Sequence, residues 1–164
     1  MQSIHRLLFE NKKLSPVWLV IRFYLGYEWI SAGYEKIINP AWAGFHAGSA
    51  LTGFVNGALA KAVGAHPDVS NWYAWFLTHV VLPNVNIWSH AIAYGEVAVG
   101  VGLVLGALTF FAALFGFFMN LNYLLSGTVS INPQMLVLSL IIMLAYRTAG
   151  YIGLDYWLMK LKHF

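Results

Sequence analysis

Apolar positions along the chain fall into long runs that are separated by short polar or proline-containing breaks. Pro16 stands at the start of the first run, and Asn39-Pro40 follows its end. Proline fits the first turn of a helix and cannot continue one, so these positions mark helix ends. The pattern predicts a four-helix bundle whose membrane-spanning helices cover about residues 15–38, 87–108, 109–126 and 133–147.

The long connection between the first two runs, residues 41–86, has a different pattern. Apolar residues recur at helical spacing from Leu51 to Val63, and a second short helix fits the stretch from Asn71 to Leu82. Tryptophan and tyrosine gather in this second helix, as they do where a membrane meets water. We therefore expect one or two extracytoplasmic interfacial helices between the first two spans.

The composition points to an integral membrane protein, because 60% of the 164 residues are hydrophobic and 9% are charged. Soluble domains carry about 25% charged residues, so this chain cannot cover a soluble surface. Residues 1–164 are expected to form one all-α domain in the lipid bilayer. No Lys/Arg-rich run suits a phosphate backbone, which excludes nucleic acid as a partner. The absence of cysteine excludes thiolate nucleophiles and cysteine-bound iron–sulfur clusters.

Charges near the ends of the chain predict its orientation. Lys and Arg precede the first span and recur in the amphipathic tail, residues 148–164, whereas residues 41–86 have few for their length. Both termini are then cytoplasmic. The N-terminal stretch resembles a signal peptide, but Arg22 lies within its apolar run, where a signal peptide is uncharged. We expect an uncleaved span of a multi-pass protein in the plasma membrane of a bacterium or archaeon.

A single charge interrupts the second apolar run, where Glu96 lies about 13 Å from the outer end. An ionised side chain at the bilayer centre costs roughly 2.5–3.5 kcal/mol, so it needs a partner or a task. The cationic candidates are Arg22, Lys36 and Arg147, and depth in the membrane favours the first two. Two interpretations stay open: an ion pair that only fixes the register of the bundle, and a functional site.

Helical spacing groups further polar residues with these charges. Arg22 and Lys36 share one face of the first span with two glycines, which allow another helix to approach closely. In the third span Asn120 and Tyr123 share a face with Gly116. The histidines lack the HxxxH and HExxH spacings of metal ligands, so no metal site is predicted.

Three pieces of the chain, residues 20–40, 94–127 and 146–157, resemble the DoxX family, which includes the DoxD-like large subunit of thiosulfate:quinone oxidoreductase. The family pattern has an early arginine, a glycine with a lysine at the end of the first span, a glutamate opening the second span, and a glycine with an aspartate near the close. In this sequence the pattern falls on Arg22, Gly33 with Lys36, Glu96, and Gly150 with Asp155. Glu35, beside the lysine, departs from the pattern by adding a charge.

The resemblance implies a membrane-bound oxidoreductase that passes electrons from thiosulfate, a small sulfur anion, to a membrane quinone held as a bound substrate. It implies catalytic roles for Glu96, as a buried proton carrier, and for Arg22, which would tune Glu96 or hold a quinone carbonyl. Substrate binding is assigned to Lys36, Asn120 and Arg147.

Two alternatives belong to other classes of protein. The first is a non-enzymatic membrane scaffold that anchors redox partner proteins and does not need Arg22 and Glu96 for turnover. The second is small-solute transport, which four spans without an inverted repeat support poorly in a monomer, although a dimer would give more room. A homodimer and a small partner subunit are both compatible with the sequence.

Overall fold

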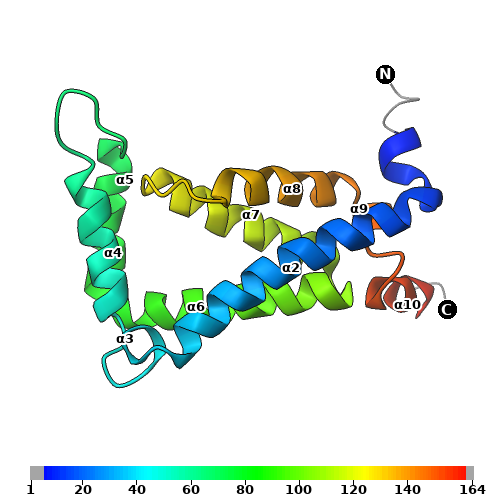
Figure 1. Ribbon diagram of the computed structural model, residues 1–164, viewed down its shortest axis with the longest axis horizontal. Coiled ribbons are helices and arrows are strands. Elements are labelled where there is room, and N and C mark those ends of the chain that lie inside the picture. The colour runs from blue at the N-terminus through cyan, green and yellow to red at the C-terminus, as the bar shows by residue number, and fades with distance from the viewer. Residues whose placement is uncertain (1–5, 162–164) are drawn as a thin grey trace.

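The computed structural model describes residues 6–161, and the regular structure in this part is helical (Figure 1). The fold is 80% helical with no strand among those residues, which confirms the all-α prediction. In chain order the helices, with η marking short 3₁₀ or π turns, are η1 (Arg6–Glu10), η2 (Lys12–Leu14), α2 (Ser15–Ile38), α3 (Pro40–Ala43), α4 (Ser49–Ala60), α5 (Asn71–Phe76), η3 (Leu77–Val81), η4 (Leu82–Asn84), α6 (Val85–Leu105), α7 (Thr109–Leu125), α8 (Asn132–Leu144), α9 (Tyr146–Ala149) and α10 (Leu154–Leu161).

Four helices, α2, α6, α7 and α8, run along the long axis of the molecule (Figure 1). We call the end that α4 and α5 cover the capped end, and the end with the start of α2, α9 and α10 the terminal end. The bounds of α2 and α7 lie within one residue of those predicted. The predicted helix 133–147 is interrupted, because α8 ends at Leu144 and α9 begins at Tyr146.

Among the described residues, one helical stretch, Asn71–Leu105, is long and apolar enough to cross a membrane. It changes direction in η4, which contains Pro83, so that α5 and α6 point in different directions in Figure 1. The 21 residues of α6 extend about 31 Å, which matches the hydrocarbon thickness of a bilayer. Helices α7 and α8 are apolar but shorter, with 17 and 13 residues.

Two apolar clusters hold the helices together. The larger one lies among the four long helices, and Leu25, Leu103 and Ile142 at its centre are completely buried. The second joins α4, α5 and η3 to α6 and α7 around the fully buried Val55 and Val69. The cap is therefore packed onto the bundle by a core of its own.

Large apolar side chains also cover the outside of the long helices. The exposed fraction is 68% for Tyr27 on α2, 69% for Ile87 on α6, 59% for Phe115 on α7 and 52% for Val137 on α8. Soluble proteins seldom expose large apolar surfaces, whereas contact with lipid favours them. This exterior is the one expected of a membrane protein.

Glycines bring α2 and α6 into backbone contact. A Cβ added at Gly33 would lie 2.8 Å from the amide nitrogen of Val97 and 2.9 Å from Cβ of Glu96. A Cβ added at Gly100 would lie 2.7 Å from a carbonyl oxygen of α2. No side chain fits in these gaps, so the two helices pack as closely as small-residue helix pairs do. The approach brings Lys36, one turn after Gly33, beside α6.

Candidate functional site

A buried ion pair joins α2 to α6 near the capped end. Glu96 on α6 is completely buried, and its Oε2 accepts a hydrogen bond of 2.7 Å from Nζ of Lys36. Of the three cations that the sequence offers, the structure brings Lys36 to Glu96. Removing either partner would leave a charge uncompensated in an apolar interior, so the pair strongly constrains how α2 and α6 align.

Tyr123 on α7 approaches the same carboxylate from the other side. Its hydroxyl donates to Oε1 of Glu96 over 2.5 Å, so each carboxylate oxygen has a donor from a different helix. We call Lys36, Glu96 and Tyr123 the buried triad. Helical spacing predicts that Tyr123 shares a face of its span with Asn120, but the sequence pattern predicts no role for it. The signal for it was a tyrosine one turn after Asn120 on a glycine-containing face.

Lys36 reaches outward from the triad. Its side chain is 19% exposed, and Nζ also donates to the carbonyl oxygen of Ala32 at 3.3 Å. The same atom lies 5.3 Å from the centre of the Trp42 ring, a distance typical of a cation–π contact. An ammonium group has three N–H donors, and the described residues use two of them. One donor is left for a ligand.

A cavity of about 420 Å³ lies beside the triad. Its lining includes the carboxylates of Glu28, Glu35 and Glu96 and a single ammonium group, that of Lys36. Within the described part of the chain, neither Glu28 nor Glu35 has an ion-pair partner. With these groups ionised, the cavity is negatively charged. Aromatic residues on α2, α3 and α4 also line it, namely Trp29, Trp42 and Phe54, together with polar residues between α7 and the start of α8, namely Thr128, Ser130 and Asn132.

Arg22 lies far from the triad, because it precedes Lys36 by fourteen positions, or about 21 Å, along α2. It is 1% exposed, and its guanidinium donates to four backbone carbonyls at the terminal end. The acceptors are Leu103 (2.9 Å), Val104 (3.3 Å), Ala149 (2.6 Å) and Ile152 (3.0 Å). Leu103, Val104 and Ala149 lie in the last turns of α6 and α9, where the helix supplies few N–H donors, and Ile152 lies in the connection after α9. Arg22 thus clamps backbone and makes no contact with Glu96.

Asp155 secures the same end of the molecule. Its carboxylate accepts hydrogen bonds from the backbone N–H groups of Leu108 at 2.6 Å and Thr109 at 2.8 Å, at the N-terminus of α7. Its own N–H donates to the carbonyl oxygen of Gly106 at 2.8 Å. Gly150 lies so close to the Asp155 side chain that a Cβ there would collide with it. In the family pattern, the closing aspartate therefore caps α7, and the closing glycine leaves room for the aspartate side chain.

Asn120 is completely buried on α7, yet neither of its amide atoms has a hydrogen-bond partner within the described residues. The same holds for Nε1 of Trp29 on α2 and Oγ of Ser139 on α8. Folded proteins leave few buried polar groups in this condition. Asn120 does not line the cavity, so the structure shows no route by which it would touch a ligand there.

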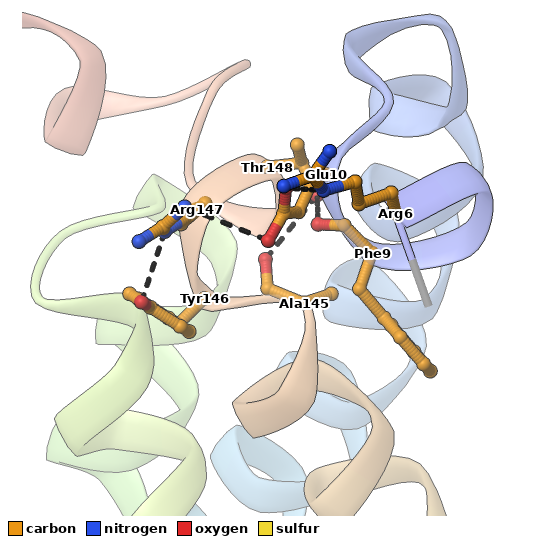
Figure 2. Close-up of polar contacts among 7 residues, drawn as sticks. All are labelled: Arg6, Phe9, Glu10, Ala145, Tyr146, Arg147 and Thr148. Atoms are coloured by element: carbon orange, nitrogen blue, oxygen red, sulfur yellow. Dashed lines mark hydrogen bonds and ion pairs between the residues drawn. The ribbon is translucent and has the colours of Figure 1, made fainter. Parts of the chain in front are cut away.

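Arg147 lies at the terminal end, in contact with the N-terminal segment (Figure 2). Its Nε donates to the hydroxyl of Tyr146 at 2.9 Å, and Nη1 lies 3.5 Å from Oε1 of Glu10. Beside it, Oγ1 of Thr148 donates to the carbonyl oxygen of Phe9 at 2.8 Å. These contacts hold η1 against α9, at the end of the molecule opposite the triad.

The described residues contain no group of three or more His, Cys, Asp or Glu side chains that could hold a metal ion.

Fold and site together define a class of protein: an all-α membrane protein with a carboxylate buried among its helices and paired with a lysine and a tyrosine.

The sequence model of the DoxX family matches residues 17–126, and the chain belongs to this family of membrane proteins. The resemblance seen in the sequence is thereby confirmed. The match runs from α2 to α7 and includes the whole buried triad, whereas α8, α9 and α10 lie outside it. The chain has no match among curated proteins or among solved structures.

Proposed function

We propose that this protein is the quinone-binding membrane subunit of an oxidoreductase and that the buried triad exchanges protons with the quinone. The observation that carries the proposal is a fully buried carboxylate, held by donors from two other helices beside a cavity. Ionisable groups inside membrane proteins mark substrate sites and proton relays. Converting a quinone to a quinol consumes protons as well as electrons, so its site needs a group that delivers them.

The charge of the cavity favours a neutral occupant. Three carboxylates and one ammonium group would repel a dianion such as thiosulfate, whereas a quinone ring carries no charge. The rings of Trp29, Trp42 and Phe54 offer apolar walls to a flat molecule. The volume also lies in the range of small-molecule sites.

Each member of the triad has a distinct role in this proposal. Lys36 directs its remaining N–H at a quinone carbonyl oxygen and so orients the ring. The Glu96 carboxylate, paired with Lys36 at 2.7 Å while it is ionised, takes up a proton and passes it to the quinone. Tyr123 fixes the carboxylate through the hydrogen bond to Oε1.

We infer that α2, α6, α7 and α8 cross the plasma membrane of a bacterium or archaeon, with both termini in the cytoplasm. Support comes from the apolar exterior of these helices and from the position of α9, α10 and the start of α2 at one end. Helix α8 extends only about 20 Å, and a short span is accommodated by local thinning of the bilayer. The capped end then faces outward.

The electron donor is assigned to a site outside the cavity that holds the quinone. The family resemblance implies a small sulfur anion such as thiosulfate, and the negative cavity leads us to place its oxidation outside the cavity, on a small partner subunit or a second copy of the chain. Two thiosulfate ions joined through a new S–S bond release two electrons, and the quinone takes up these electrons and two protons to become the quinol. The second candidate function is the non-enzymatic scaffold that anchors redox partners. Exposed aromatic residues at the capped end favour it, namely Phe45 (95% exposed), Trp72 (62%) and Trp75 (60%).

The deciding experiment measures bound quinone and thiosulfate-dependent reduction of a soluble quinone analogue in the complex that copurifies with this chain in mild detergent. We expect Glu96→Gln to lower reduction at least about a hundredfold, because general acid–base groups contribute about that much. Glu10→Gln, in an ion pair with Arg147 at the terminal end, is the matched control and should keep the wild-type rate. Protein without quinone and without turnover would leave the scaffold as the function.

A further inference from the structure

A second cavity, of about 120 Å³, lies between the cap and the bundle, enclosed by α4, α5, η3, α6 and α7. Its lining is almost entirely apolar and includes Leu51, Val55, Leu77, Trp88, Ile92 and Met119. We call it the apolar pocket. A cavity of about 150 Å³ with such a lining stays dry and binds benzene, so this pocket suits a hydrocarbon group of similar size.

The apolar pocket and the polar cavity adjoin each other at two side chains, Phe54 and Tyr123, which line both. The two rings meet edge to face with their centroids 6.1 Å apart. Tyr123 therefore has its hydroxyl on Glu96 and its ring beside the apolar pocket. The two rings form the boundary between the cavities, so a molecule with a polar head and an apolar tail would occupy both by passing beside Phe54 or Tyr123.

The apolar pocket also reaches the outside of the bundle. Phe118 on α7 contributes to its lining and is 58% exposed on the face that we assign to lipid. A tail that fills the pocket can continue past this residue into the bilayer. Only the part of a tail nearest to its head is then enclosed by protein.

We propose that the apolar pocket binds the first isoprene unit of a prenylated ring compound whose polar ring occupies the cavity beside the triad. The inference rests on the proposed function, since it assumes a quinone ring in that cavity. An isoprene unit has nearly as many carbons as benzene and matches the pocket in size and polarity. The site thus recognises the first isoprene unit of the tail, and the remaining units lie in the bilayer.

The test compares three probes: 2,3-dimethoxy-5-methylbenzoquinone, the same ring carrying one prenyl unit, and the same ring carrying two. Binding to purified protein is followed by the shift in Tm. We expect the first prenyl unit to raise affinity about tenfold or more, because it gains packing contacts in a pocket of matching size, and the second unit to add less than threefold. Equal affinity for all tail lengths would overturn the inference.

Filling the pocket provides the matching variant. Ile92→Phe places a ring in the apolar pocket and should remove the gain from the first prenyl unit while leaving the tail-less quinone bound. Val101→Phe, on the exposed face of the same helix, is the control and should keep the gain. A gain that survives Ile92→Phe would contradict the proposed pocket.

A second measurement on the wild-type protein keeps the inference testable if Ile92→Phe does not fold. Fluorobenzene binding is observed by fluorine NMR, and the prenylated quinone should displace it whereas the tail-less quinone should not. If the prenylated quinone displaces fluorobenzene but no donor reduces it, the tail site is supported and the proposed function is contradicted. If the quinone is reduced but does not displace fluorobenzene, the proposed function is supported and the tail site is contradicted.

Discussion

At the scale of single residues, two buried polar side chains have opposite surroundings. Glu96 has a donor on each carboxylate oxygen, whereas Asn120 has no partner in the described part of the chain. A buried polar group without a partner costs about 1–3 kcal/mol. The amide of Asn120 therefore lowers the stability of this bundle, and its presence is not explained by packing.

Asn120→Leu should raise the free energy of unfolding by about 1–3 kcal/mol, because leucine removes an unpaired amide and has a similar volume. Asn122→Leu, two positions further, should lower it instead. The Asn122 side chain donates to the carbonyl oxygen of Phe118 at 2.8 Å and accepts from the hydroxyl of Tyr73 at 3.0 Å. Thermal unfolding in detergent measures both variants. Equal destabilisation by the two changes would show that Asn120 has a partner in the folded protein.

At the scale of helices, the terminal end depends on a clamp made by Arg22 and Asp155. The tight connection between α6 and α7 begins with Gly106 at a φ of 63°, and the Arg22 guanidinium lies against it. Asp155 binds the N-terminus of α7, while Arg22 binds the end of α6 and the chain around α9. The segment after α8 is thereby fixed to the bundle.

Arg22→Lys should destabilise the protein by about 2–3 kcal/mol, because an ammonium group cannot reach the carbonyls that the guanidinium fork joins. We also expect faster proteolysis in residues 150–161, with little change in quinone affinity. Arg147→Lys, in an exposed ion pair, is the control and should change stability by less than about 1 kcal/mol. A variant that unfolds like the wild type but loses turnover would return Arg22 to a catalytic role.

At the scale of the whole molecule, the long helices and the cap determine which segments face each side of the membrane. The loop between α4 and α5 lies beyond the capped end, and α10 lies at the terminal end (Figure 1). The proposed topology places these two segments on opposite sides of the bilayer.

Single cysteines can test this topology directly, since the chain has no cysteine of its own. A membrane-impermeant maleimide should label Ala65→Cys, in the loop before α5, on intact cells. Lys160→Cys, in α10, should react only after the cells are permeabilised. Labelling of both positions on intact cells would contradict the assignment of the termini to the cytoplasm.

The sequence by itself determined the features that depend on local pattern. Apolar runs predict helices, and prolines next to polar residues end them, so the all-α class and the bounds of α2 and α7 follow from the chain. Family membership also followed from short motifs in order. The break at Ala145 did not follow, because no proline or glycine marks that position in the sequence.

Only the tertiary structure decided which residues form the site. Helical periodicity places Arg22 and Lys36 on one face of α2, but it does not say which of them meets Glu96. The contact of α2 with α6 at Gly33 brings Lys36 to the carboxylate and leaves Arg22 among backbone carbonyls. Tyr123 joins from a third helix. Such pairings depend on where helices cross, and crossing is set by packing between segments that are distant in the sequence.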